Sequence, residues 1–374
     1  MAIEKRQFKD EVIYRVRIHQ RGRIVASRNF DDYDAARAWE SQQKLLVRRG
    51  FNVSAAALPV EVYVERWLSM RGDSAPATIR RQDSLLELWV LPRWAGVPLD
   101  QIRRSDVRLW AKEVASLRSP STARLAVGVL RQVLSVACDD GLLQSNPAEN
   151  VRLQSRVANL PRPLTHEQLH LLAAAMPTET YRVLTLVLGY SGLRIGEAIA
   201  LDVPDFLEER GSLSVYRAYS LTGEGEKRRL GPTKTSQTRV VPLPQVIQED
   251  LRSYVIASST ERTNKTRETD IANTPLFFDS QRDDKRVYPG NYKDTLIALC
   301  SKLDIPRITP HNLRDTCATL AINAGATAPE VAQLLGHSSS HVTLTHYGHF
   351  FENGLSSVAS RLDEQAVKFS KRAP

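Results

Sequence analysis

The first part of the chain alternates apolar and polar positions before it changes to a helical period. Between residues 12 and 18 every second residue is apolar, and two of the positions between them are arginines. This alternation predicts a strand with one buried face, followed by a turn at 20–22 and a second strand over 23–30. Residues 34–46 carry apolar side chains at near-helical spacing, which predicts an amphipathic helix. We therefore expect a small unit over residues 1–50, in which the helix covers the apolar face of a sheet.

The next part, residues 58–150, follows a helical period almost throughout. Thr78 is the expected N-cap of one helix, and Pro92 should end that helix because proline cannot continue it. Ser105 should begin another helix, and the longest apolar stripe follows over residues 121–139. These patterns predict an all-helical unit of about four helices.

The remainder, residues 161–374, is predicted to be mostly helical with one strand-rich insert. Thr165 and Gln168 have the spacing of a capping box, so a helix should begin there. Residues 213–219 and 239–243 alternate well enough to be strands. The whole chain therefore predicts a mainly α fold with small β elements, an α+β class, in three domains.

We place the predicted domains at residues 1–50, 58–150 and 161–374. A chain of 374 residues has the length for two or three domains. Its 42% hydrophobic and 25% charged residues are typical of a globular protein. The sequence has no apolar run long enough to span a membrane and does not start with the apolar core of a secretory signal. We therefore expect no membrane partner.

The net charge and the cysteines indicate the kind of partner and the redox environment to expect. The net charge of +9 favours a polyanionic partner. Cys138, Cys300 and Cys317 lie far apart and form no CxxC pair, so we expect no disulfide framework and a reducing cytoplasm. Packing is the expected role of these thiols.

Basic residues are concentrated in the first predicted unit. Residues 12–30 contain five arginines and no acidic residue. A solvated sheet face would normally mix the two signs, so this concentration favours a DNA-binding face. The predicted DNA contacts are Arg15, Arg17, Arg21, Arg23 and Arg28. The basic residues of the second unit suit a groove for the DNA backbone and a solvated face equally well.

Four short motifs in the third domain carry residues suited to chemistry on a phosphate. They are GLRIGEA at 192–198, PTKT at 232–235 with TRVVPL at 238–243, TPHNLRDT at 309–316, and LLGHSS at 334–339 with Tyr347 ten residues after His337. Each motif by itself is common, but all four in this order are hard to obtain by chance.

The arginines of these motifs suit a phosphodiester in its transition state. Cleavage builds charge on two non-bridging oxygens, and a guanidinium donates two parallel hydrogen bonds to such a group. Arg194 lies in a glycine-flanked turn, where its head can reach a ligand. His311 and Arg314 are three residues apart, so they share one face of a helix. Glu197 is expected to orient a basic neighbour.

Tyr347 is the expected nucleophile. A phenol needs proton removal or a strong positive field to attack at neutral pH, and the nearby cations supply that field. Lys234 is the expected general acid for the leaving 5′ oxygen, since a lysine near other cations gives up its proton more readily. His337 is expected to donate to a non-bridging oxygen. The arginines make a metal unnecessary, and no P-loop is present, so we expect no cofactor.

The four motifs together resemble the tyrosine recombinase family, the phage integrases. The resemblance covers the third domain and extends more loosely to the first two, which are similar to arm-binding and core-binding domains. It implies a clamp around double-stranded DNA attachment sites, a homotetramer, a 3′-phosphotyrosine intermediate and a Holliday junction. It further implies integration of a phage or mobile-element genome in the bacterial cytoplasm. A DNA-bending host factor is implied as well, and an excisionase would direct excision.

Two other functions remain as alternatives. A DNA-binding regulator without catalysis would share the basic N-terminal units. A metal-dependent hydrolase would use the histidines between residues 337 and 349, although no HExxH motif or cysteine pair accompanies them. The apolar spacing from Leu355 to Val367 predicts a helix in the tail, which would dock on its own domain or on a neighbouring protomer.

Overall fold

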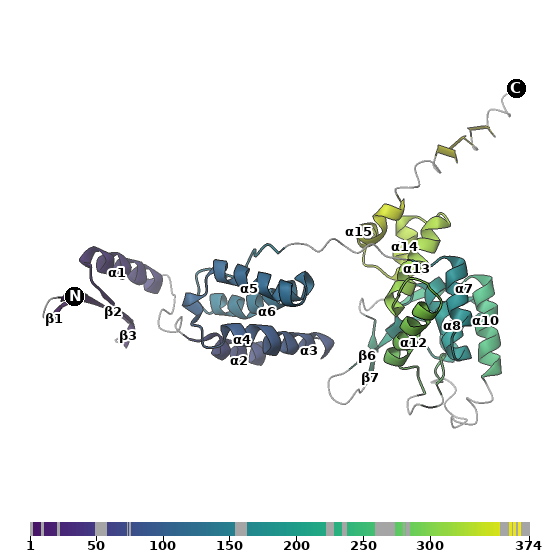
Figure 1. Cartoon of the computed structure of the whole chain (residues 1–374), viewed down its shortest axis with the longest axis horizontal. Coiled ribbons are helices and arrows are strands. Elements are labelled where there is room, and N and C mark those ends of the chain that lie inside the picture. The colour runs from purple at the N-terminus through teal and green to yellow at the C-terminus, as the bar shows by residue number, and fades with distance from the viewer. Residues whose placement is uncertain are drawn as a thin grey trace. The chain divides into compact units, whose positions relative to one another are not determined.

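The computed structural model, drawn in Figure 1, divides the chain into two compact units, Met1–Ala158 and Asn159–Pro374. It describes the chain except for residues 1–2, 9–10, 21–22, 49–57, 73, 75, 154–162, 222–227, 234–237, 259–273, 280, 282–284, 352–358, 361, 364–365 and 368–374. None of the described helices combines the length and the apolar character that a bilayer crossing requires.

The N-terminal residues form a sheet and a helix, as predicted. Strands β1 (Ile3–Phe8), β2 (Glu11–Gln20) and β3 (Arg23–Phe30) make an antiparallel sheet in the order β1-β2-β3, and α1 (Tyr33–Arg48) follows. Their hydrophobic cluster centres on Val16, Ile18 and Ala36. Strand β1 was not predicted, because four of its six residues carry charged or amide side chains and show no apolar alternation.

The following residues form an all-helical arrangement, which the apolar period predicted. The elements are α2 (Val60–Met70), α3 (Pro76–Leu85), a π-helical turn η2 (Leu86–Val90), α4 (Leu91–Trp94), the 3₁₀ turn η3 (Leu99–Gln101), α5 (Arg104–Leu117) and α6 (Pro120–Asp139). Their buried side chains form a hydrophobic cluster of their own, which includes Trp94, Trp110 and Leu130.

The prediction that Pro92 ends a helix was wrong. The π-helical turn η2 runs directly into α4, and Pro92 lies in the first turn of α4. The Leu91 N–H donates to the Leu86 carbonyl, so the helix continues through the π-helical turn, and Pro92 stands where the hydrogen bonding changes to the α-helical pattern.

The second unit is mostly helical with short strands. Its helices are α7 (His166–Ala174), α8 (Glu179–Ser191), α9 (Ile195–Ala198), α10 (Gln245–Ala257), α12 (Pro289–Lys302), α13 (Pro310–Asn323), α14 (Ala328–Leu335) and α15 (Ser340–Phe351), with 3₁₀ turns η4 (Val203–Asp205) and η5 (Glu208–Arg210). Helix α8 packs against α7, α10 and α13 in the main core. The predicted capping box of Thr165 and Gln168 is confirmed at the start of α7.

The described residues of the insert in the second unit form five strands. β4 (Phe206–Leu207), β5 (Ser212–Val215) and β8 (Arg239–Pro242) make one antiparallel sheet, and β6 (Arg217–Leu221) pairs with β7 (Arg228–Pro232) in another. The single strand predicted over 213–219 is therefore two strands in two sheets. Arg217 holds the second of these sheets in place by donating to the Ala200 carbonyl and to the carboxylates of Asp202 and Asp205. The predicted tail helix lies largely outside the described residues.

Candidate active site

Arg194 is placed by the turn between α8 and α9. Gly192 ends α8 with a φ of 64°, and a Cβ at this position would lie 2.4 Å from Leu335 Cδ2, so the turn requires glycine. Arg194 is then the N-cap of α9, and its backbone N–H donates to Glu197 Oε2 at 3.0 Å. The Arg194 side chain is 31% exposed, so part of its guanidinium is open to a ligand.

Glu197 is a buried carboxylate between two arginines. Only 1% of its side chain is exposed. Arg194 Nη1 donates to Glu197 Oε1 at 2.8 Å, and Arg239 Nη2 donates to Oε2 at 2.7 Å. Burial opposes ionisation of Glu197, but the hydrogen bonds and charges of Arg239 and Arg194 outweigh it, so its pKa lies below the usual value. This geometry places Arg239 beside Glu197 as well, and the orienting role of Glu197 stays a prediction.

Arg314 is the most deeply buried of these cations. It is 2% exposed, and its Nη1 donates to the Gly192 carbonyl at 2.7 Å. Burial and the charge of Arg194 lower its pKa to about 10. Arg314 Nη2 and Arg239 Nε are both buried, and neither has a hydrogen-bond partner in the described part of the chain. Buried N–H groups are costly when unpaired, so these two atoms are ready donors for an anion.

His337 follows the end of α14. Its Nδ1 lies 2.8 Å from the hydroxyl of Thr343. Burial lowers its pKa to about 4, and the charges of Arg314 and Arg194 act in the same direction. His337 is therefore neutral at neutral pH, and its ring lies in the field of Arg314 and Arg194.

His311 lies in the first turn of α13, one turn before Arg314, as the spacing predicted. Its side chain is exposed, whereas Arg314 is buried. One helix therefore carries both an inner guanidinium and an outer imidazole.

Tyr347 lies on α15 and is 3% exposed. Its ring belongs to a small hydrophobic cluster with Ala318 and Leu335. Its hydroxyl donates to Asp315 Oδ1 at 2.6 Å. Burial raises the pKa of Tyr347, and the hydrogen bond to Asp315 raises it further. The structure thus brings Tyr347 to the residue that follows Arg314 in α13.

Three other tyrosines of this unit, Tyr181, Tyr190 and Tyr292, have different surroundings from Tyr347. Tyr292 is fully buried and shares a hydrogen bond with Thr185, and Tyr181 packs edge-on against it. The Tyr190 hydroxyl lies 2.8 Å from His166 Nδ1 and 3.1 Å from His170 Nε2. None of these contacts involves the arginines described above.

Lys234 lies outside the described residues, so its predicted role remains a prediction. The preceding residue, Thr233, directly follows β7 and is buried. Five residues after Lys234, Arg239 begins β8 and contacts Glu197.

The predicted N-terminal DNA contacts are only partly described. Arg15 and Arg17 lie on the same face of β2, where Arg15 is paired with Glu4 of the missed strand and Arg17 contacts Glu4 at 3.6 Å. Arg28 is opposite Val16, so it points to the other face. Strand β1 brings Glu4 to the face of Arg15 and Arg17 together with Arg6, which donates to Glu4, so β1 leaves the net charge of that face unchanged.

Of the other two predicted contacts, Arg21 lies outside the described residues and Arg23 begins β3. Their contacts with DNA remain predictions.

The described part of the chain holds no group of three histidine, cysteine or acidic side chains placed to share a metal ion. Of the histidines considered for a metal site, His337 contacts Thr343, and the ring of His349 lies 4.1 Å from that of Phe350. Burial raises the pKa of Cys317 to about 12, which suits a packed thiol rather than a reactive one.

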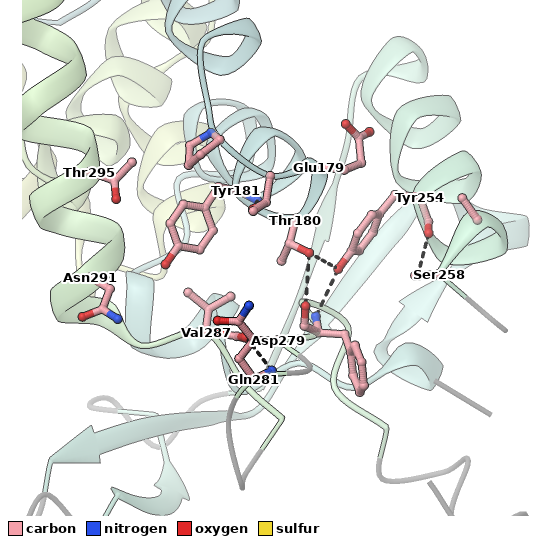
Figure 2. A pocket seen from close by; sticks show the side chains of 14 residues that line it. Glu179, Thr180, Tyr181, Tyr254, Ser258, Asp279, Gln281, Val287, Asn291 and Thr295 are labelled. Carbon is pink, nitrogen blue, oxygen red and sulfur yellow. Dashed lines mark hydrogen bonds between the residues drawn. The ribbon is translucent and has the colours of Figure 1, made fainter. Parts of the chain in front are cut away.

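A cavity of about 640 Å³ on the same unit, seen in Figure 2, is lined by the start of α8, the end of α10, Asn291 and Thr295 of α12, and residues of the segment before α12. Thr180 and Tyr254 share a hydrogen bond of 3.0 Å at its wall. None of the predicted catalytic residues lines this cavity.

Comparison with known proteins identifies the family. Residues 162–353, just over half of the chain, match the model of the phage integrase family. The integrase of Mycobacterium phage D29 is 27% identical over 334 residues, which cover 87% of this chain and 86% of that protein. The chain therefore belongs to the phage integrase family, whose members are tyrosine site-specific recombinases.

Solved structures share the fold. The Tn1549 transposon integrase in complex with transposon right-end DNA superposes with a TM-score of 0.68 at 21% identity, over 82% of this chain and 100% of that chain. A lambda integrase tetramer bound to a Holliday junction superposes with a TM-score of 0.55 at 16% identity, over 87% of this chain and 89% of that chain.

Proposed function

We propose that this integrase cuts and rejoins double-stranded DNA through a covalent phosphotyrosine at Tyr347. The observation that carries the proposal is a pair of buried guanidinium N–H groups on Arg314 and Arg239 that have no partner among the described residues, beside the partly open Arg194. A phosphodiester oxygen would satisfy these donors, and Tyr347 contacts the residue next to Arg314.

The chemistry proceeds in two reversible steps. The Tyr347 oxygen attacks the phosphorus, and Arg194, Arg314 and His337 donate hydrogen bonds to the non-bridging oxygens. Lys234 gives a proton to the departing 5′ oxygen, and His311 supports the outer side of the phosphate. The product is a 3′-phosphotyrosine, which keeps the bond energy, so rejoining by a 5′ hydroxyl requires neither ATP nor a metal.

The substrates in this proposal are attachment sites, and the outcome is integration of a phage or mobile-element genome. The likeness to the phage D29 integrase supports this assignment. The lambda integrase was solved as a tetramer on a Holliday junction, which supports a homotetramer for this chain. We further propose a DNA-bending host factor, an excisionase that directs excision, and action on DNA in the bacterial cytoplasm.

The three predicted domains divide this work. Residues 1–50 would bind an arm-type site, residues 58–150 the core site, and residues 161–374 would carry the chemistry. Separate hydrophobic clusters in the N-terminal sheet and in the α2–α6 helices support the first boundary.

Covalent joining in the presence of EDTA tests the chemistry. We expect the wild-type protein to become attached to a nicked duplex that carries its crossover site, because the cations of the site replace a metal. Denaturing electrophoresis detects the adduct, and mass spectrometry of its peptides should place the DNA on the peptide containing Tyr347. Loss of the adduct on chelation, with recovery on adding Mg²⁺ or Zn²⁺, would contradict the proposal and favour the histidines between 337 and 349.

Deletion of residues 1–50 tests the arm-binding assignment. We expect cleavage of a short core duplex to persist while integration of a full attachment site collapses, because only the full site contains arm sequences. The matched control replaces Arg15 and Arg17 with alanine in the full chain, which should flatten the salt dependence of full-site binding. Equal loss of both activities, or of neither, would show that the assignment is wrong.

A further inference from the structure

An acidic side chain contacts the hydroxyl of the proposed nucleophile, Tyr347. The Tyr347 hydroxyl donates to Asp315 Oδ1 at 2.6 Å, and Asp315 is 8% exposed. Asp315 lies on α13 directly after Arg314 and one turn after His311. The carboxylate therefore stands on the same helix that presents two of the proposed phosphate contacts.

The carboxylate is held in place by the start of its own helix. Asn312 Nδ2 donates to Asp315 Oδ2 at 3.2 Å. The other end of the Asn312 amide accepts two hydrogen bonds from Thr309, from the backbone N–H at 2.9 Å and from the hydroxyl at 2.8 Å. These bonds fix which end of the amide faces Asp315. Asp315 Oδ2 is thus occupied, and Oδ1 is directed to the phenol.

The other acid–base groups described around the nucleophile are engaged differently. Both oxygens of Glu197 accept from Arg194 and Arg239. His337 contacts Thr343 through Nδ1 and lies in the field of Arg314 and Arg194. An arginine cannot accept a proton in its charged form. Of these groups, Asp315 is the one that contacts the Tyr347 hydroxyl.

We propose that Asp315 is a catalytic residue, which accepts the Tyr347 proton as the phenolic oxygen attacks the phosphorus. This inference rests on the proposed function, in which Tyr347 is the nucleophile. The phenolic O–H bond breaks, and its proton passes to Asp315 Oδ1. The new bond joins the Tyr347 oxygen to phosphorus, and the bond from phosphorus to the 5′ oxygen breaks. In rejoining, Asp315 returns the proton to the phenolic oxygen as that oxygen leaves.

The electrostatics of the contact favour a concerted transfer. Burial and the neighbouring carboxylate raise the pKa of Tyr347, so a free phenolate is disfavoured at neutral pH. Moving the proton to Asp315 during attack avoids that state. If the contact with Asp315 only held the tyrosine back from attack, then removing the carboxylate would make cleavage faster. The sign of the effect of Asp315→Asn separates the two roles.

The test is single-turnover cleavage of a nicked core duplex, with the protein bound to it beforehand. Asp315→Asn keeps the shape of the side chain and loses the proton acceptor. We expect it to cleave at least about 100-fold more slowly than the wild type at neutral pH, the contribution typical of a general base. Its rate should then rise roughly tenfold per pH unit, since only the phenolate attacks, while the wild-type rate changes less steeply. Asp294→Asn, on the exposed side of α12, is the charge-matched control and should cleave at the wild-type rate.

Two further variants keep the inference open to refutation. Asp315→Ala should regain cleavage in formate, which supplies a carboxylate, whereas chloride at equal ionic strength should not restore it. Asp315→Asn that cleaves as fast as the wild type, or faster, would overturn the inference, and so would a failure of formate to rescue Asp315→Ala. A covalent adduct formed by Tyr347→Phe would instead overturn the proposed function itself.

Discussion

Tyr347→Phe is expected to bind the crossover site with unchanged affinity and to form no covalent adduct. The change removes one oxygen, the proposed attacking atom, and leaves the ring in its hydrophobic cluster with Ala318 and Leu335. Because phenylalanine has no oxygen to attack the phosphorus, the expected loss is complete rather than partial. Denaturing electrophoresis of the protein with a nicked suicide duplex measures the adduct, and a gel-shift titration measures binding.

Tyr190→Phe is the matched control for this experiment. It also removes one phenolic oxygen, but from a tyrosine that contacts His166 and His170. We expect this variant to form the adduct at the wild-type level. A covalent band retained by Tyr347→Phe would assign the chemistry to another tyrosine.

Glu197→Ala is expected to lower the free energy of unfolding by about 3–5 kcal/mol, the cost of breaking a buried ion pair on one side. The carboxylate is 1% exposed and neutralises Arg194 and Arg239 together, so its loss leaves two nearby guanidinium groups uncompensated. Adduct formation should fall as well, because Arg194 loses the partner that orients it. Urea denaturation followed by circular dichroism measures the stability.

Glu179→Ala provides the control on the same unit. Glu179 pairs with Arg182 at 2.7 Å, but its side chain is 55% exposed. A surface ion pair contributes at most about 1 kcal/mol, so this variant should remain near wild-type stability. If Glu197→Ala were no more destabilising than Glu179→Ala, the buried carboxylate would not be holding the two arginines.

Much of the fold was predictable because its helices bury one apolar stripe each. The stripe over residues 121–139 became α6, and the capping box at Thr165 began α7. Predictions from local sequence patterns failed where the surrounding structure determines the backbone conformation. Strand β1 is a mostly charged edge strand without apolar alternation, and Pro92 is accommodated by a change from π-helical to α-helical hydrogen bonding.

The candidate site was predictable where residues stand in short motifs and not where they depend on the fold. Arg194, Arg314 and His337 come from three motifs, and the described structure shows them interacting electrostatically. Asp315 and Arg239 also stand in these motifs, TPHNLRDT and TRVVPL, but the motifs alone did not assign a role to either residue. Only the packing of α15 on α13 and of β8 beside α9 reveals their contacts.

Two glycines of the site have a consequence for engineering this recombinase toward new DNA sequences. Gly192 lies under Leu335, and a Cβ on Gly336 would lie 3.0 Å from the Arg239 guanidinium carbon. Both also have positive φ, at 64° and 69°. In a library that randomises the motifs at 192–198 and 334–339, most members would therefore carry a strained residue at one of these two positions. Holding both codons fixed would direct the sampled diversity to positions where a side chain has room to change specificity.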